Sequence, residues 1–139
     1  MSEHRKQTFI GLVAAIMVIG MTMPVAQARQ VTETLVGDME RGERLYRQRC
    51  MACHALDANR AGPSHRGVFG REAGAVDGYR YSGALRDSGI IWTAETLDSW
   101  LSNPTGLVPG TSMGVRTRNA QDRADIISYL ESLSPAEPD

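Results

Sequence analysis

The chain has 139 residues, 42% of them hydrophobic, and its 15 Lys plus Arg nearly balance its 16 Asp plus Glu, for a formal net charge of −1. This length suits a single domain of ordinary size with a modest core. The charges alternate along the chain without a basic block, so nucleic acid is not expected as a partner.

Residues 1–28 are predicted to be a secretory signal peptide. A basic start, His4-Arg5-Lys6, is followed by an apolar run over 9–23 and by Ala26-Gln27-Ala28, which fits a cleavage site. The alternative is an uncleaved anchor at the membrane, although the run is short for a span. Cleavage after Ala28 would leave a chain with 13 Arg, no Lys and 15 Asp plus Glu, and with no membrane span.

The chain after the signal begins with a polar lead-in at 29–36, which has no clear period and is expected to be flexible. Asp38 can then cap a helix over 39–50. The residues of one face of this helix are Met39, Gly42, Leu45, Tyr46 and Cys50.

That helix leads directly into Cys50-Met51-Ala52-Cys53-His54. The pattern C-x-x-C-H is the attachment signature of a c-type haem, in which two thioethers hold the porphyrin and the adjacent imidazole becomes an axial ligand of the iron. Zinc would normally need a second pair of ligands, and a dithiol redox site would need a βαβ pattern; the sequence has neither. Haem attachment in bacteria is completed outside the cytoplasm, so the motif agrees with export and favours a periplasmic location.

Glycine dominates residues 55–81, and no helical or strand period survives there. We interpret this long segment as a loop wrapped on the haem, which supplies the apolar surface that such a loop would otherwise lack. Ser82 can cap a short helix ending at Ser88-Gly89, and Thr93 a second one that Asn103-Pro104 stops.

The last part of the chain holds an extended loop over 108–114 and a final helix that Asn119 can cap and Ser134-Pro135 ends. No strand pattern or repeat appears, so the fold class is predicted as all-α, with a haem domain over 37–134 and a tail over 135–139. The expected apolar face of the final helix consists of Ile126, Ile127, Tyr129, Leu130 and Leu133.

The second axial ligand should lie far from His54 in the sequence. Met113 follows a stiff segment that contains Pro109 and Gly110, and a thioether presented from such a loop is a soft ligand suited to iron. Met51 is confined to the proximal side by the attachment motif, and Met39 is interpreted as a packing residue. His65 remains the rival candidate.

With these ligands placed, the chain resembles a class I cytochrome c, close to the mitochondrial and photosynthetic-bacterial soluble type, over roughly 37–133. This resemblance implies a small cytochrome c fold in which the first and last helices cross and the loops surround one covalently bound haem. The matching landmarks are the C-x-x-C-H motif, Gly62-Pro63, Gly67-Val68-Phe69-Gly70-Arg71, Tyr79-Arg80-Tyr81-Ser82, Gly89-Ile90-Ile91-Trp92, Asn103-Pro104, Pro109-Gly110-Thr111-Ser112-Met113 and Arg123 to Leu130.

The resemblance also implies roles at these positions. Cys50 and Cys53 match the thioether cysteines, and His54 and Met113 match the proximal and distal iron ligands. Pro63 matches the residue whose carbonyl accepts the proximal imidazole N–H. The expected donors around the haem propionates are Arg71, Tyr81, Trp92 and Thr111, and the helix crossing is expected to bring Gly42 and Tyr46 to Ile126 and Tyr129.

Several positions depart from the family pattern. His65 stands where the family usually has a leucine on the haem, Leu85 replaces a common asparagine and Trp100 a tyrosine. The family's lysine ring around the haem edge is missing as well, since the chain after the signal has no lysine. We therefore expect weak electrostatic steering of partners.

These features predict a monomeric periplasmic one-electron carrier rather than an enzyme, because a six-coordinate haem offers no open position to a substrate. Its redox partners would be a dehydrogenase or cytochrome bc1-type donor and an oxidase or photosynthetic acceptor. The alternatives are a haem subunit or dedicated acceptor of a periplasmic dehydrogenase and, more distantly, a peroxidase-like haem enzyme.

Overall fold

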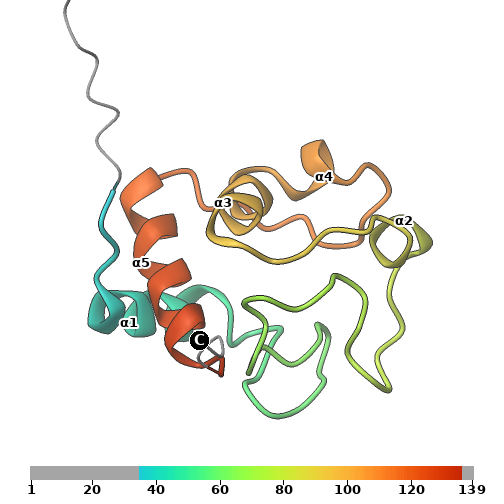
Figure 1. Cartoon of the computed structure of the whole chain (residues 1–139), viewed down its shortest axis with the longest axis horizontal. Coiled ribbons are helices and arrows are strands. Elements are labelled where there is room, and N and C mark those ends of the chain that lie inside the picture. The colour runs from blue at the N-terminus through green and yellow to red at the C-terminus, as the bar shows by residue number, and fades with distance from the viewer. Residues whose placement is uncertain (1–34, 136–139) are drawn as a thin grey trace, which may run out of the picture. The chain divides into compact units, whose positions relative to one another are not determined.

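Five helices form the framework of the part of the chain that the computed structural model describes, residues 35–135. They are α1 (Met39–Arg49), α2 (Gly83–Arg86), α3 (Ala94–Ser102), α4 (Pro104–Leu107) and α5 (Ala120–Ser132) (Figure 1). The predicted signal peptide and most of the lead-in and tail lie outside these residues. None of the helices described is long and apolar enough to cross a membrane.

The helix starts agree with the sequence. In each case the predicted cap residue accepts a backbone N–H three residues further along the chain, which satisfies one of the free donors in the first turn. These confirmed caps are Asp38 with Arg41, Ser82 with Leu85, Thr93 with Thr96 and Asn119 with Asp122.

Two helix ends differ from the prediction. Helix α2 stops at Arg86 rather than at Ser88-Gly89, and Asp87 is its C-terminal cap. Helix α3 ends at Ser102 as expected, but Asn103-Pro104 also begins the short helix α4. The reason is that proline suits the first position of a helix, because a backbone N–H there would have no partner within the helix.

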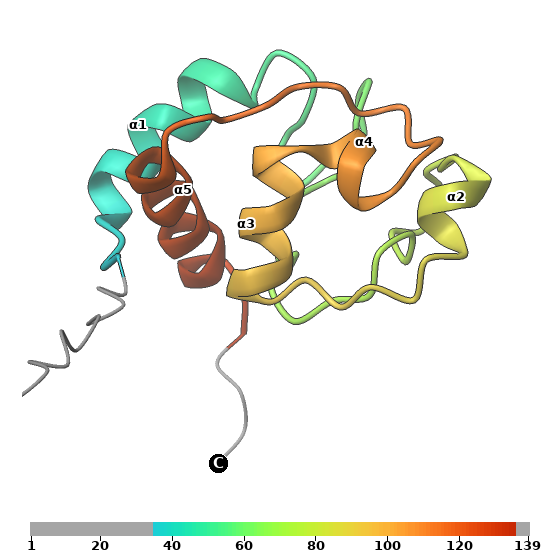
Figure 2. The ribbon, with the colours of Figure 1, turned by 90° about the horizontal axis from the view of Figure 1, so that it is seen from above.

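Helices α1 and α5 cross in close contact, and α3 packs on α5 (Figure 2). A Cβ atom added to Gly42 would lie 1.9 Å from the backbone oxygen of Asp125, so the crossing requires a residue without a side chain there. Tyr46 packs on Tyr129 with ring centroids 5.4 Å apart. The predicted contact between the first and last helices is therefore confirmed.

Buried carboxylates tie the same two helices together. Asp125 is fully buried and accepts hydrogen bonds from the Asp38 N–H and from Gln121, both at 2.8 Å, and from the Arg41 guanidinium. Asp122 is also bonded to Arg41. These polar contacts therefore take the place of apolar packing along part of the crossing. The sequence predicted only that Asp122 lies in the first turn of the last helix.

The segments between the helices are loops, as predicted. Their glycines include Gly67, Gly70, Gly74 and Gly78, all with positive φ. Within residues 35–135 the only β-type pairing is an isolated antiparallel bridge between Glu72 and Ile91. The all-α fold class is confirmed.

Candidate haem site

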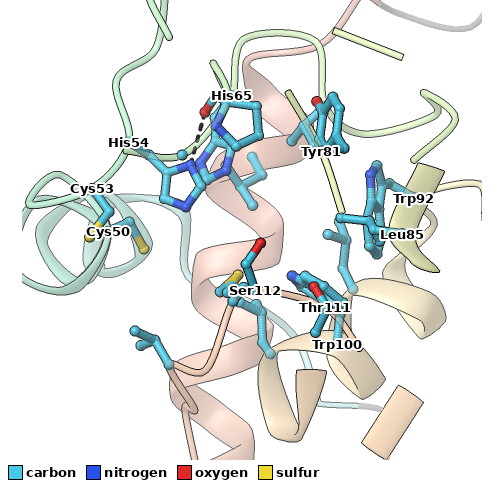
Figure 3. A pocket seen from close by; sticks show the side chains of 18 of the residues that line it. Cys50, Cys53, His54, His65, Tyr81, Leu85, Trp92, Trp100, Thr111 and Ser112 are labelled. Atoms are coloured by element: carbon cyan, nitrogen blue, oxygen red, sulfur yellow. Dashed lines mark hydrogen bonds between the residues drawn. The ribbon is translucent and has the colours of Figure 1, made fainter. Parts of the chain in front are cut away.

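The loops and helices enclose a cavity of about 330 Å³. In Figure 3 the two cysteines and His54 lie along one edge of this cavity, and Tyr81 and Trp92 lie along the other. All nine residues that the sequence proposed for the site line it: Cys50, Cys53, His54, Pro63, Arg71, Tyr81, Trp92, Thr111 and Met113.

The attachment motif continues the C-terminal end of α1 as a tight turn. The N–H groups of Cys53 and His54 both donate to the carbonyl of Cys50, at 3.0 and 2.9 Å. Burial raises the pKa of the Cys50 thiol to about 11, although the nearby charge of Arg49 opposes this effect. A reactive dithiol has a lowered pKa, so this environment fits structural attachment better than thiol redox chemistry.

His54 is oriented by its surroundings. Its Nδ1–H donates to the Pro63 carbonyl at 2.8 Å, which leaves Nε2 as the free nitrogen that could bind a metal. Desolvation lowers the pKa of His54, an effect that the bond to Pro63 partly opposes, so the imidazole stays neutral at pH 7. A Cβ added to Gly62 would lie 2.2 Å from Cε1 of this ring, so the ring fits only because residue 62 has no side chain.

Arg71 is a half-buried cation at the edge of the cavity. Its guanidinium donates to the carbonyls of Ser64 and Arg66, at 3.0 and 3.1 Å, and it has no carboxylate partner among the residues described. Desolvation lowers its pKa. A cation without a counter-ion in such a place fits the carboxylates of a haem, because a buried charge needs an opposite charge or donors around it.

The loop after α4 brings Met113 to the cavity. Met113 is half-buried and packs against the core, and Gly110, at φ 92°, turns the chain ahead of it. The wall nearby is aromatic, since Trp92 and Trp100 are both buried with ring centroids 5.2 Å apart. A thioether and a neutral imidazole from separate segments of the chain thus line one apolar space, a donor set that suits haem iron.

His65 does not lie where a rival ligand would have to be. Its ring stacks on the ring of His54, with centroids 3.9 Å apart and planes 22° from parallel. Two imidazoles on the same side cannot bind opposite faces of one iron, so this arrangement removes His65 from the candidates for the distal position. Burial, together with His54 and Arg71, lowers the pKa of His65 to about 3.

Two features of the site were not assigned from the sequence. The sequence indicated Gly62 only as part of Gly62-Pro63 and did not predict that its lack of a side chain makes room for the His54 ring. Its position eight residues after the C-x-x-C-H histidine could have indicated this role. The contact between His65 and Tyr46, whose hydroxyl lies 3.2 Å from Nδ1, had no local signal, because the two residues are 19 positions apart.

Comparison with known proteins places the chain in a family. The family profile for cytochrome c matches residues 39–134. The chain belongs to the cytochrome c family. It is a class I cytochrome c: members of the family carry one covalently bound haem c and transfer electrons, and they are not enzymes, so these three predictions are confirmed.

Individual relatives support this assignment. Cytochrome c 2.1 of Caenorhabditis elegans is 45% identical over 98 residues, which cover 68% of this chain and 88% of that protein. Cytochrome c-type cyt cy of Rhodobacter capsulatus is 40% identical over 112 residues, covering 79% of this chain but 56% of that protein. The solved structure of cytochrome cH from Methylobacterium extorquens superimposes with a TM-score of 0.66 at 40% identity, over 69% of this chain and 99% of the other.

Proposed function

We propose that this cytochrome c is a periplasmic one-electron carrier whose single haem is bound through Cys50 and Cys53 and ligated by His54 and Met113. The observation that supports the proposal most strongly is the position of His54, whose Nδ1 is bonded to Pro63 while its ring borders the cavity that Met113 also lines. The bound haem supplies the one-electron chemistry. The chain supplies two ligands from separate segments.

With His54 and Met113 both bound to the iron of a haem, the site would be restricted to electron transfer. The same two ligands in both oxidation states would keep the geometry nearly unchanged on electron transfer, and they would leave no position for a substrate or for oxygen. Four residues that line the cavity would hold the haem carboxylates: Arg71, Tyr81, Trp92 and Thr111. This arrangement supports a carrier and disfavours a peroxidase-like enzyme, which needs an open iron position.

The test replaces Met113 by alanine in the haem-loaded protein. We expect the near-infrared sulfur–iron band to disappear and the midpoint potential to fall by more than about 59 mV, a tenfold change for one electron. Met39→Leu is the matched control, because Met39 is exposed and lies on α1, away from the cavity lining. An unchanged band and potential in Met113→Ala would refute the ligand assignment.

The charge of the surface bears on the partners. Arg49, which lies at the cavity, has its guanidinium bonded at 2.8 Å to Asp122, so its charge is already compensated. With no lysine after residue 28, we propose donors and acceptors that do not depend on a strongly acidic docking surface. Stopped-flow reduction and oxidation with dehydrogenase, cytochrome bc1, oxidase and photosynthetic candidates would identify them. A steep fall in rate between low and moderate ionic strength would contradict this proposal.

Export and assembly complete the proposal. We propose cleavage after Ala28, a monomeric haem domain over 37–134 and a periplasmic location, on the basis of the basic start, the apolar run and the A-x-A sequence of residues 1–28. Mass spectrometry of the protein from the periplasmic fraction should give the mass of residues 29–139 plus one haem. A haem-loaded chain that keeps residues 1–28 and stays with the membrane would support the anchor instead.

A further inference from the structure

The second imidazole of the site, His65, has contacts on both of its sides. One side stacks on the proximal ligand His54 at 3.9 Å between ring centroids, and the other carries Nδ1, which shares a hydrogen bond of 3.2 Å with the hydroxyl of Tyr46. The ring of Tyr46 packs in turn on Tyr129 of α5. A continuous series of rings therefore runs from the crossing of α1 and α5 to the proximal ligand.

The backbone around His65 is equally restrained. Its N–H donates to the Ala55 carbonyl at 3.0 Å, and its own carbonyl accepts from the Val68 N–H at 3.0 Å. The carbonyls on either side of it, those of Ser64 and Arg66, both accept from the guanidinium of Arg71. These bonds fix the backbone at residue 65 independently of the stack, so the ring starts from a restrained main chain.

We propose that His65 is a positioning residue for the proximal ligand, holding the His54 imidazole in one orientation by stacking on it while Tyr46 anchors His65 to the helix crossing. A leucine, which the family usually has at this position, could neither stack as a flat ring nor bond to Tyr46. The proposal rests on the proposed ligation by His54 and adds a second restraint to the one that Pro63 provides through Nδ1.

Two physical effects follow from the stack. The orientation of the ligand ring determines how its orbitals overlap those of the iron, so the electronic structure of the oxidised protein should depend on residue 65. The polarisable imidazole beside the ligand also favours the more highly charged oxidised iron, relative to an apolar side chain of similar size. His65 should therefore lower the potential.

The test uses His65→Leu, Tyr46→Phe and the double variant, all haem-loaded. In the oxidised protein we expect altered hyperfine-shifted haem methyl resonances in both single variants. We also expect the reduction equilibrium with a fixed mediator to favour the reduced form by up to about tenfold in His65→Leu, which is about 59 mV, and by less in Tyr46→Phe. Since Tyr46 acts through His65, its substitution should change little when leucine is already at position 65.

Tyr129→Phe is the matched control, because it also removes one hydroxyl from the same ring cluster but from a ring that packs on Tyr46 rather than on a histidine. A merely structural role would lower the stability of the variants and leave the resonances and potential as they are, which would overturn the proposal. Loss of the sulfur–iron band in His65→Leu would also overturn it, because the residue would then act on ligation. If His65→Leu does not fold, Tyr46→Phe alone decides, since unchanged resonances there exclude the coupling. The Met113→Ala experiment tests the distal ligand separately, so its failure would not be mistaken for failure of the role of His65.

Discussion

The crossing of α1 and α5 and the loop shell around the cavity are stabilised in different ways. At the crossing, buried side chains meet one another directly, with Gly42 against the backbone of α5 and Asp125 bonded on several sides. In the shell, the loops are held mainly by backbone hydrogen bonds, and they line the cavity. The helix pair is therefore stabilised by direct contacts between its own residues, whereas we expect the loops that line the cavity to gain contacts from a bound haem.

The largest effect should come from Gly42→Ala at the crossing. Alanine normally stabilises a helix interior by about 1 kcal/mol over glycine, but here its Cβ would meet the Asp125 oxygen at 1.9 Å. We expect the free energy of unfolding of the haem-loaded protein to fall by about 3 kcal/mol, measured in urea. Gly83→Ala in α2, where a Cβ would meet nothing closer than 3.7 Å, is the control and should be neutral or stabilising.

A smaller effect is expected from Asp125→Asn. Burial alone would raise the pKa of Asp125, but the hydrogen bonds from the Asp38 N–H, Gln121 and Arg41 outweigh it and hold the pKa below its ordinary value. The ionised carboxylate therefore stabilises the fold at neutral pH, and this contribution is lost as pH falls below about 4 and through the lowered pKa. We expect a loss of about 2 kcal/mol at pH 7 that shrinks in acid.

Urea unfolding from pH 3 to 8 measures this effect. Asp57→Asn is the control, because Asp57 forms an exposed ion pair with Arg66 that should contribute little. A constant difference between the wild type and Asp125→Asn across the whole range would show that the pKa of Asp125 is not lowered by folding.

The smallest effect should come from Arg71→Leu in the shell. Loss of its bonds to the Ser64 and Arg66 carbonyls should lower the stability by about 1–2 kcal/mol. Hydrogen exchange should become faster for the amides of 65–68, while those of α1 stay protected. Arg80→Leu, at an exposed arginine, is the control. Equally faster hydrogen exchange in residues 65–68 and in α1 would contradict the view that the helix crossing and the loop shell are stabilised separately.

The sequence predicted the helices well because their signals are local. Each cap residue acts three positions further along, so Asp38, Ser82, Thr93 and Asn119 could be identified without knowledge of the fold. The short helix α4 was not predicted, because proline can end one helix and also occupy the first turn of the next. The C-x-x-C-H motif likewise carried its chemistry within five residues.

What could not be predicted depends on residues far apart in the sequence. His65 stacks on His54 because the loop after Pro63 is bonded to the carbonyls of Ala55 and Leu56. Arg71 holds the same loop by donating to the carbonyls on either side of His65. Likewise, the bonds of Asp125 cross to α1, more than eighty positions away. Such pairings follow from the path of the chain, which no local pattern encodes.

The bare backbone of Gly62 beside the ring of His54 also has a consequence for natural variation. Every amino-acid substitution at residue 62 would place a Cβ atom against the His54 ring, so we expect no other residue to be tolerated there. Gly89, by contrast, has φ 65° and nothing within 4 Å of an added Cβ, so asparagine should survive there. A saturation library selected for red, haem-bearing colonies would read out this contrast directly.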